Sequence, residues 1–438
     1  MNRPPDLLAE ARAAAGDHDR LRAIARESLT ARLPSLDGVN IGIVLREAGL
    51  RAEALSVFDH LGAADARDIL SRYEKAILYL HEGSHAEALG SLQEILAHHP
   101  HEDRTNLVAA RLLHAMGDHA AGDAALDRIP MLGHPERQEI EALARVLREF
   151  GRFVAEYPRA RALAMANAVS ASPRYLPVGD VAAAAAAALE ARRGFSLIRV
   201  GDGEGAFAHL GAADEARFPH LYRHNRRDRA HVWFAGTIDA QDRGFLDTAF
   251  GITDAMREAD IVGMPYPNWI RHEYTILSVT GISTLVNLLR VARPPQATSC
   301  TQLIHLELHQ SGLLYRLMRQ QEAIGLIACH RDLPALLTAA FGFSEIDYHP
   351  VPGEKGHSHL VAASSVEGTH WPDRFHAVME SLSRPLHGRL YLVAAGLLGK
   401  LYCRRIRDSG GVALDIGSLA DGWMGFGTRP GLGRLALA

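Results

Sequence analysis

The pattern of apolar and polar positions changes about 165 residues into the chain. Before that point the apolar positions follow a repeating unit, and after it short β-rich runs alternate with segments of helical character. The runs are residues 195–200, 260–265, 323–329, 345–351, 389–395 and 411–417. Strands that are buried on both faces and separated by helices indicate a mostly parallel, Rossmann-like sheet of the α/β class.

Helices are predicted beside these runs. The alanine-rich segment 178–194 is one, with Asp180 as its N-cap and Gly194 as its end. Residues 282–292 form a second candidate, and residues 397–411 form a third that the glycine pair 410–411 closes. The alternation of strands and helices therefore predicts a single α/β domain in the later part of the chain.

The repeating unit of the first part is 34 residues long. It is marked by a series of glycines, Gly49, Gly83, Gly117 and Gly151, with Gly16 one residue out of register. Other positions repeat with them: Ala54 corresponds to Ala88, and Phe58 corresponds to Leu92 and Leu126. The small residue allows two helices to approach closely, and the glycine is expected to end the first helix of each pair. The pattern predicts stacked helix–turn–helix units.

This period resembles the tetratricopeptide repeat, because Tyr79 and Pro100 also fall where that repeat has its packing aromatic and its terminating proline. The resemblance implies an all-α domain over residues 1–165 with a concave surface for a peptide, a protein or an acceptor. The identified positions are packing positions only. A domain that caps its neighbour or joins two copies of the chain is therefore an equal alternative.

Composition narrows the class of protein. The chain has 438 residues, enough for two or three domains, and a net charge of −4, which argues against a nucleic-acid partner or a basic membrane-binding face. Its three cysteines are widely spaced and form no CxxC pair, which favours reduced thiols and a cytoplasmic location. No apolar segment has the length of a transmembrane helix or a signal-peptide core, so neither is expected.

Polar residues follow several of the predicted strands. They are Asp202, Glu204, Tyr266, Asn268, His330, Glu354, Lys355, Lys400, Asp415 and Ser418. Ligands of parallel α/β sheets bind at the carboxyl ends of the strands. This placement favours a binding or catalytic site over a purely structural domain.

The segment FSLIRVGDGEGAF places two carboxylates, Asp202 and Glu204, among glycines directly after a predicted strand. Carboxylates two residues apart in extended chain lie about 6–7 Å apart on one side and repel each other. A divalent cation, Mg²⁺ or Mn²⁺, removes that repulsion, since both ions prefer oxygen ligands. The alternative is a solvated acidic turn.

Three further segments carry candidate chemistry. Gly396 and Lys400 surround a turn between a strand and a helix, where free N–H groups attract phosphate, although the segment is not a Walker motif. Glu354 or Lys355 belongs to an expected active-site loop, and Trp269 and Tyr274 of the segment 266–274 are candidates for stacking on a base or sugar. Each segment has a structural alternative. The glycines around Lys400 could serve only tight packing of the strand against the helix, the loop with Glu354 and Lys355 could be an exposed polar loop, and the aromatic residues could belong to the hydrophobic core.

Taken together, FSLIRVGDGEGAF, HPVPGEKG and the segment 391–423 resemble the GT-D-type glycosyltransferases, over about residues 175–425, which leaves 426–438 as a tail. The resemblance implies that Asp202 and Glu204 hold a divalent metal and the diphosphate of a nucleotide sugar. The expected catalytic set is Asp202, Glu204, Glu354 and Asp415. The expected donor-binding set is Arg199, Gly201, Gly203, Lys355, Gly396, Lys400 and Ser418. Ser418 stands where the family pattern has a histidine, so either the acceptor-binding side or the catalytic group on that loop is expected to differ from the family.

The sequence thus predicts a metal-dependent glycosyltransferase that transfers a sugar from a nucleotide sugar to a protein-linked glycan or a surface polysaccharide. The family resemblance implies that the donor is a UDP-sugar. Two alternatives stay open. A metal-dependent phosphoesterase would use the same carboxylates but needs more metal ligands than the sequence offers. A non-enzymatic adaptor would bind partners through the repeats and keep a degenerate α/β domain.

Overall fold

In the computed structural model, the chain folds into two compact units, Met1–Ala155 and Glu156–Ala438. The structure describes residues 7–14, 17–31, 33–130, 136–201, 203–208, 212–234, 238–239, 242–273, 278–290, 294, 296–353, 361, 364–428 and 435–437.

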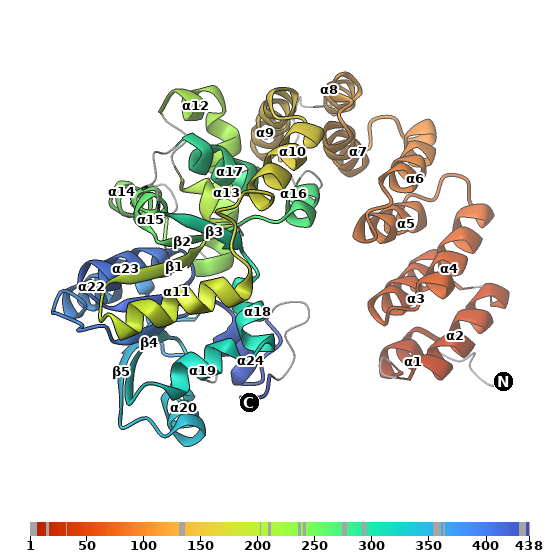
Figure 1. The fold of residues 1–438 in the computed structure, drawn as a ribbon. Helices are drawn as coiled ribbons and strands as arrows, with labels where there is room; N and C mark the ends of the chain where they lie inside the picture. The colour runs from red at the N-terminus through yellow and green to blue at the C-terminus, as the bar shows by residue number, and fades with distance from the viewer. Residues whose placement is uncertain are drawn as a thin grey trace. The chain divides into compact units, whose positions relative to one another are not determined.

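Every regular element in the described residues of the first unit is a helix (Figure 1). They are α1 (Leu7–Ala13), α2 (His18–Thr30), α3 (Ser35–Glu47), α4 (Arg51–Ala64), α5 (Leu70–His81), α6 (His85–His98), α7 (Asp103–Met116), α8 (His119–Asp127) and α9 (Arg137–Glu156). Successive helices pair as α3 with α4, α5 with α6 and α7 with α8. This is the helix–turn–helix arrangement that the 34-residue period predicts.

Three of the repeat glycines lie in the turns between paired helices. Gly49, Gly83 and Gly117 have φ values of 76°, 72° and 92°, a backbone conformation that glycine adopts without steric cost. Gly151 differs, because it lies inside helix α9 and packs against His114 and His119. The prediction that it ends a helix is therefore wrong, and Gly16 lies outside the described residues.

The equivalent small and large positions of the repeats form the cores of the helix pairs. Ala54 and Ala88 have no exposed surface, and Phe58 and Leu92 are also buried. Small residues at these positions let the paired helices approach closely. The packing positions of the sequence repeat are confirmed.

The second unit contains a seven-stranded sheet in which every pair of neighbouring strands is parallel. The strands are β1 (Phe195–Arg199), β2 (Ile261–Met264), β3 (Thr298–Thr301), β4 (Ala323–Ala328), β5 (Glu345–Pro350), β6 (Leu390–Val393) and β7 (Val412–Asp415), in the order β3-β2-β1-β7-β6-β4-β5. The α/β fold class is confirmed. All six predicted runs contain a strand, and β3 was not predicted.

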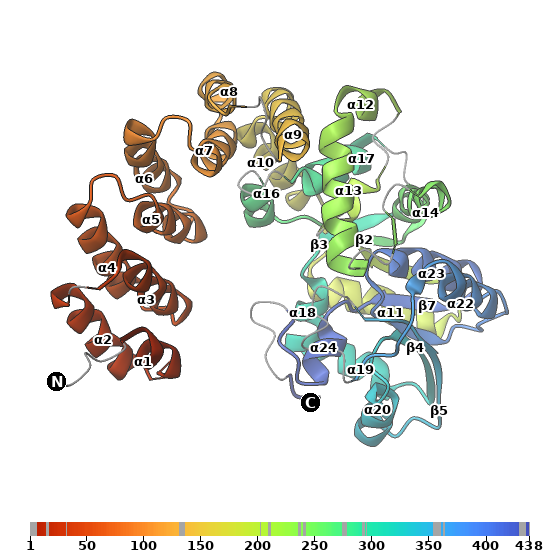
Figure 2. The same ribbon diagram turned by 180° about the vertical axis from the view of Figure 1, so that it is seen from behind.

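Helices cover both faces of this sheet. They are α10 (Arg159–Ser170), α11 (Val178–Glu190), α12 (Ala212–Arg217), α13 (Pro219–Phe234), α14 (Arg243–Ala249), α15 (Ile252–Glu258), α16 (Pro267–Glu273), α17 (Thr280–Arg290), α18 (Ile304–Gln310), α19 (Leu313–Arg319), α20 (Leu333–Phe341), α22 (Phe375–Ser381), α23 (Gly396–Asp408) and α24 (Leu419–Trp423). Helix α11 crosses in front of the strands in Figure 1, whereas Figure 2 shows α22 and α23 over the opposite face. The sheet is therefore the middle of three layers.

Both ends of α11 differ from the prediction. Pro177 is its N-cap residue and Asp180 lies in the first turn, where a carboxylate still favours the positive end of the helix dipole. The helix ends at Glu190, before the positive-φ residue Arg192. Gly194 serves a close approach instead, because a Cβ there would lie 2.1 Å from the carbonyl oxygen of Arg407.

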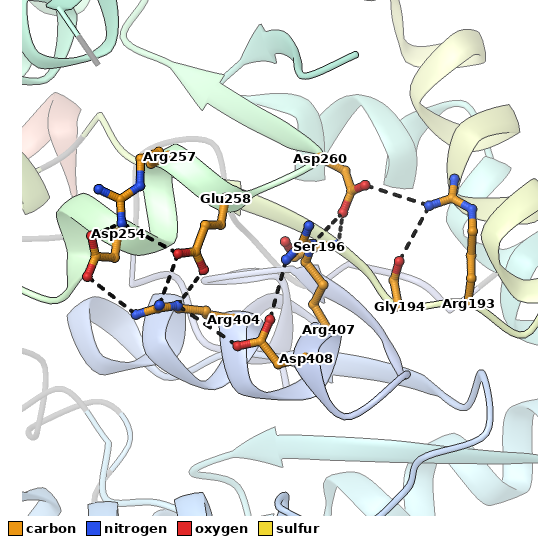
Figure 3. Close-up of polar contacts among 10 residues, drawn as sticks. All are labelled: Arg193, Gly194, Ser196, Asp254, Arg257, Glu258, Asp260, Arg404, Arg407 and Asp408. Atoms are coloured by element: carbon orange, nitrogen blue, oxygen red, sulfur yellow. Dashed lines mark hydrogen bonds and ion pairs between the residues drawn. The ribbon is translucent and has the colours of Figure 1, made fainter. Parts of the chain in front are cut away.

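Ion pairs fix α23 against the neighbouring elements (Figure 3). Arg404 donates two hydrogen bonds to Glu258 of α15, at 2.7 and 3.0 Å. Arg407 donates to Asp260, whose carboxylate also accepts from the backbone N–H of Ser196 in β1. These interactions hold α23 beside β1 and β2 and so position the residues at its N-terminal end.

Within the described part of the chain, no helix combines the length and the apolar character that crossing a membrane requires.

Candidate active site

The glycine-rich segment after β1 is shaped by close approaches to the chain around it. A Cβ at Gly201 would lie 1.7 Å from Gln302 Oε1, and one at Gly205 would lie 1.7 Å from the carbonyl oxygen of Thr280. Real Cβ atoms do not come so close to other atoms, so the backbone neighbour requires glycine at position 205, whereas a Cβ at position 201 would displace the Gln302 side chain. The two glycines bring Glu204, in the 3₁₀ turn Glu204–Ala206, into the core of the domain.

Replacing Gly205 by alanine is expected to lower the free energy of unfolding by about 1–3 kcal/mol or more, because the new methyl group overlaps a backbone carbonyl that cannot rotate away. Chemical denaturation monitored by circular dichroism measures this. The control is Gly179→Ala in helix α11, which has open space around it and is expected to be neutral or stabilising by up to about 1 kcal/mol. Equal effects of the two variants would contradict the explanation.

Lys400 joins the ends of two strands. Its ammonium lies 2.9 Å from Glu204 Oε1 and 2.9 Å from Asp415 Oδ2, and it donates a hydrogen bond to the carbonyl oxygen of Gly396 at 3.1 Å. All three charged side chains are at least nine-tenths buried. The repulsion expected around Glu204 is therefore offset, in part, by a lysine nearly 200 residues away in sequence.

Arg199, the last residue of β1, is the second cation of the cluster. Its guanidinium lies 3.3 Å from Asp415 Oδ1, donates to the carbonyl oxygen of Gln302 at 3.2 Å, and lies 2.9 Å from His305 Nδ1. The backbone N–H of Arg199 donates to the other oxygen of Asp415. Asp415 thus holds Arg199 and Lys400 together.

Ionisation follows from these interactions. Burial alone would raise the pKa of Asp415, but Arg199 and Lys400 outweigh it and lower that pKa to about 2. Burial likewise opposes the charge of Lys400, and Asp415 and Glu204 outweigh it and raise the pKa of the lysine. Counting described residues only, two cations match two carboxylates. The cluster therefore carries no surplus positive charge.

His305 stays neutral in this surrounding, because burial and the nearby Arg199 lower its pKa well below the usual range. Unfolding exposes an imidazole with an ordinary pKa of about 6.5, so the unfolded chain binds a proton that the folded chain does not. The contribution of His305 to stability is therefore complete above pH ~6.5 and is lost as pH falls below it.

His305→Gln is expected to reduce the loss of stability below pH 6.5 by up to about 1.4 kcal/mol per pH unit, the effect of one proton. Denaturation curves between pH 7 and pH 5 measure this, and His376→Gln, an exposed imidazole, is the control. His370 also has a pKa lowered by burial, to about 3, so the wild-type slope includes its contribution and only the difference between variants is diagnostic. Parallel slopes for wild type and His305→Gln would contradict a neutral buried His305.

A cavity of about 390 Å³ lies above the cluster, at the carboxyl ends of the strands. Its lining includes six residues of the expected catalytic and donor-binding sets: Arg199, Gly201, Glu204, Gly396, Lys400 and Ser418. Asp415 is absent from the lining and lies beneath, next to both cations. Gly203 lies in the turn and packs toward Arg229 and Trp233. Asp202, Tyr274, Glu354 and Lys355 lie outside the described residues.

Several lining residues were not singled out from the sequence. Gln302 and His305 follow β3, the strand without an apolar signature, and Asp421 belongs to α24. Trp233, Phe234 and Trp269 supply aromatic surface, and only Trp269 among them is a stacking candidate from the sequence. Three buried polar atoms on this lining have no hydrogen-bond partner in the described part of the chain: Arg199 Nε, Gln302 Oε1 and Trp269 Nε1. Such atoms are expected to find partners on a ligand.

The described residues around Glu204 do not by themselves complete a divalent-cation site. In the described part of the chain, the only group of three potential ligands in close range is Cys329, His330 and Asp421, and Glu204 instead pairs with an ammonium. A cation site at the Asp-Gly-Glu segment therefore depends on Asp202.

Comparisons with known proteins agree with this fold. The family model described as a GT-D fold-like domain matches residues 176–423, and a tetratricopeptide repeat model matches residues 79–147. A crystal structure of a tetratricopeptide repeat protein from Parabacteroides merdae ATCC 43184 is similar at 18% identity, with a TM-score of 0.27, covering 36% of this chain and 70% of that one. No curated protein matches. Because the first family model spans more than half of the chain, the protein belongs to the GT-D fold-like domain family, with tetratricopeptide repeats before that domain.

Proposed function

We propose that the protein is a glycosyltransferase that moves a sugar from a nucleotide sugar, a UDP-sugar in the first instance, to a hydroxyl of a glycan or polysaccharide. The observation that carries the proposal is the buried cluster of Arg199, Lys400, Glu204 and Asp415, which underlies the 390 Å³ cavity of a GT-D fold-like domain. Transfer breaks the bond between the sugar and the diphosphate, and the leaving diphosphate must be stabilised.

Arg199 and Lys400 are the cations placed for that task. Both line the cavity, and both are held in position by Asp415 rather than by solvent. Positions fixed before the reaction are what electrostatic stabilisation of a leaving group requires. The first turn of α23, which begins at Gly396, adds backbone N–H groups that point toward an anion.

A divalent cation, Mg²⁺ or Mn²⁺, is part of the proposal. The described cluster is electrically balanced, so a diphosphate brings negative charge that these side chains do not offset. Glu204 and Asp202 would hold the cation, and its chemistry there would be to neutralise the diphosphate oxygens.

The aromatic lining fits the remainder of a nucleotide sugar. Trp233, Phe234 and Trp269 offer flat surfaces for a base or a sugar ring, and the unpartnered Trp269 Nε1 and Gln302 Oε1 offer one donor and one acceptor. The repeats of the first unit are proposed to recruit the protein or glycan that carries the acceptor.

The test is a donor panel. The protein is incubated with UDP-, GDP-, CMP- and TDP-sugars in the presence of Mn²⁺ or Mg²⁺, and the release of free nucleotide is followed by chromatography. Release of free nucleotide from one class of donor is the expected result. A folded protein that neither binds nor cleaves any nucleotide sugar would refute the proposal.

A further inference from the structure

A second carboxylate lines the cavity in a different setting from Glu204. Asp421, in helix α24, lies six residues after Asp415. Its Oδ1 lies 2.8 Å from His330 Nε2, and its Oδ2 accepts a hydrogen bond from the hydroxyl of Thr428 at 2.6 Å. Within the described part of the chain no arginine or lysine forms an ion pair with it.

His330 is built to hold Asp421 in one orientation. It follows β4 and has no exposed surface, and its other ring nitrogen lies 2.6 Å from Ser364 Oγ. Its ring stacks on Phe426, with the ring centroids 5.4 Å apart. A carboxylate fixed on both oxygens, with part of its side chain (21%) still exposed toward the cavity, is suited to receive a proton from a bound group.

We propose that Asp421 is the general base that activates the acceptor hydroxyl, and that His330 and Thr428 are positioning residues; the proposal rests on the proposed function. In the reaction, the acceptor oxygen forms a bond to the anomeric carbon of the donor sugar. The bond from that carbon to the diphosphate oxygen breaks, and its electron pair leaves with the nucleoside diphosphate. The hydroxyl proton passes to Asp421. A single displacement of this kind inverts the anomeric configuration.

The same group of side chains also has the composition of a metal site, because the ligand atoms of Cys329, His330 and Asp421 lie within 4.8 Å of one another. The distances favour the base. Two ligands of a tetrahedral zinc ion, each about 2.0 Å from the metal, are about 3.3 Å apart. The nitrogen of His330 and the oxygen of Asp421 are 2.8 Å apart, the distance of a hydrogen bond.

Azide distinguishes a base from a structural carboxylate, because it attacks as an anion and needs no proton removed. Wild type and Asp421→Asn are supplied with UDP-glucose, UDP-galactose or UDP-N-acetylglucosamine, and the products with water and with sodium azide are measured separately. The asparagine can keep both hydrogen bonds, since its oxygen still accepts from His330 and its amide donates to the hydroxyl of Thr428. Asp408→Asn, an exposed carboxylate at the end of α23, is the matched control.

Asp421→Asn is expected to lose hydrolysis by about 10²- to 10⁴-fold. It is expected to form the glycosyl azide, of inverted configuration, at the wild-type rate and to bind UDP as wild type does in calorimetry. Equal loss with water and azide, or no loss with either, would overturn the proposal while wild-type activity leaves the proposed function intact. A glycosyl azide of retained configuration, or a cobalt–thiolate absorption band on adding Co²⁺, would also overturn it. A wild type that uses no donor refutes the proposed function and this inference with it.

Discussion

Replacing Lys400 by methionine is expected to lower the free energy of unfolding of the second unit by about 3–5 kcal/mol, the cost of leaving buried charges without a partner. Methionine has similar length and no charge. It would leave Glu204 without the ammonium 2.9 Å away and would leave Asp415 with Arg199 as its only cation among described residues. One of the two carboxylates would then have to take up a proton, or the cluster would have to admit water.

Thermal and denaturant unfolding, followed for the transition of the second unit, measures the effect of Lys400→Met. The chain has three lysines, at positions 75, 355 and 400, so Lys75→Met is a natural control. Lys75 pairs with the largely exposed Asp59, so Lys75→Met is expected to lower the free energy of unfolding by about 1 kcal/mol or less. Adding Asp415→Asn to Lys400→Met is expected to recover part of the loss, because it removes the surplus negative charge and leaves one cation, Arg199, and one carboxylate, Glu204, in the described cluster. A Lys400→Met variant as stable as wild type would refute the ion-pair account.

Much of the fold could be predicted because its cause is local. A strand buried on both faces needs a largely apolar run, and the five inner strands β1, β2, β4, β6 and β7 have one, whereas the edge strand β5 keeps polar residues and is only partly buried. β3 lacks such a run: Thr298–Thr301 pairs with β2 at the edge of the sheet and, through Ser299 alone, with Tyr175, and only Cys300 among its residues is fully buried. The turn positions of the repeat glycines also follow from local sequence. Identical spacing does not require an identical role, however, because Gly151 lies inside helix α9.

The site could be predicted only as a set of separate strand ends. Glu204, Lys400 and Asp415 each follow from their own segment, but no local pattern indicates that one ammonium lies between the two carboxylates. Gln302 and His305 are not predicted as site residues, because they follow β3, the strand that the sequence pattern does not predict. Asp421 is not predicted either, because its proposed role depends on its contact with His330, which lies after β4 and is distant in sequence.

Changing Glu204 to glutamine is expected to abolish the dependence of UDP binding on metal. The change leaves Lys400 and Arg199 facing Asp415 alone, so the described cluster gains one net positive charge. At a separation of about 10 Å and an effective dielectric constant of about 20, one unit charge acting on another is worth about 1.7 kcal/mol. Binding of UDP without metal is therefore expected to strengthen, by roughly tenfold.

The enhancement of UDP binding by Mn²⁺ is expected to disappear in the same variant, because the amide is a poor ligand beside Asp202, and turnover is expected to fall by about 10²- to 10³-fold. Calorimetry of UDP binding with Mn²⁺ and with a chelator, on wild type and Glu204→Gln, gives the four affinities needed. Glu345→Gln serves as the control, because that carboxylate is largely exposed at the start of β5 and pairs with Arg389. If Glu204 only holds Lys400 in place, the variant will bind UDP more tightly without metal and will keep the full Mn²⁺ enhancement. That result would remove Glu204 from the proposed cation site and leave its ion pair with Lys400 as its role.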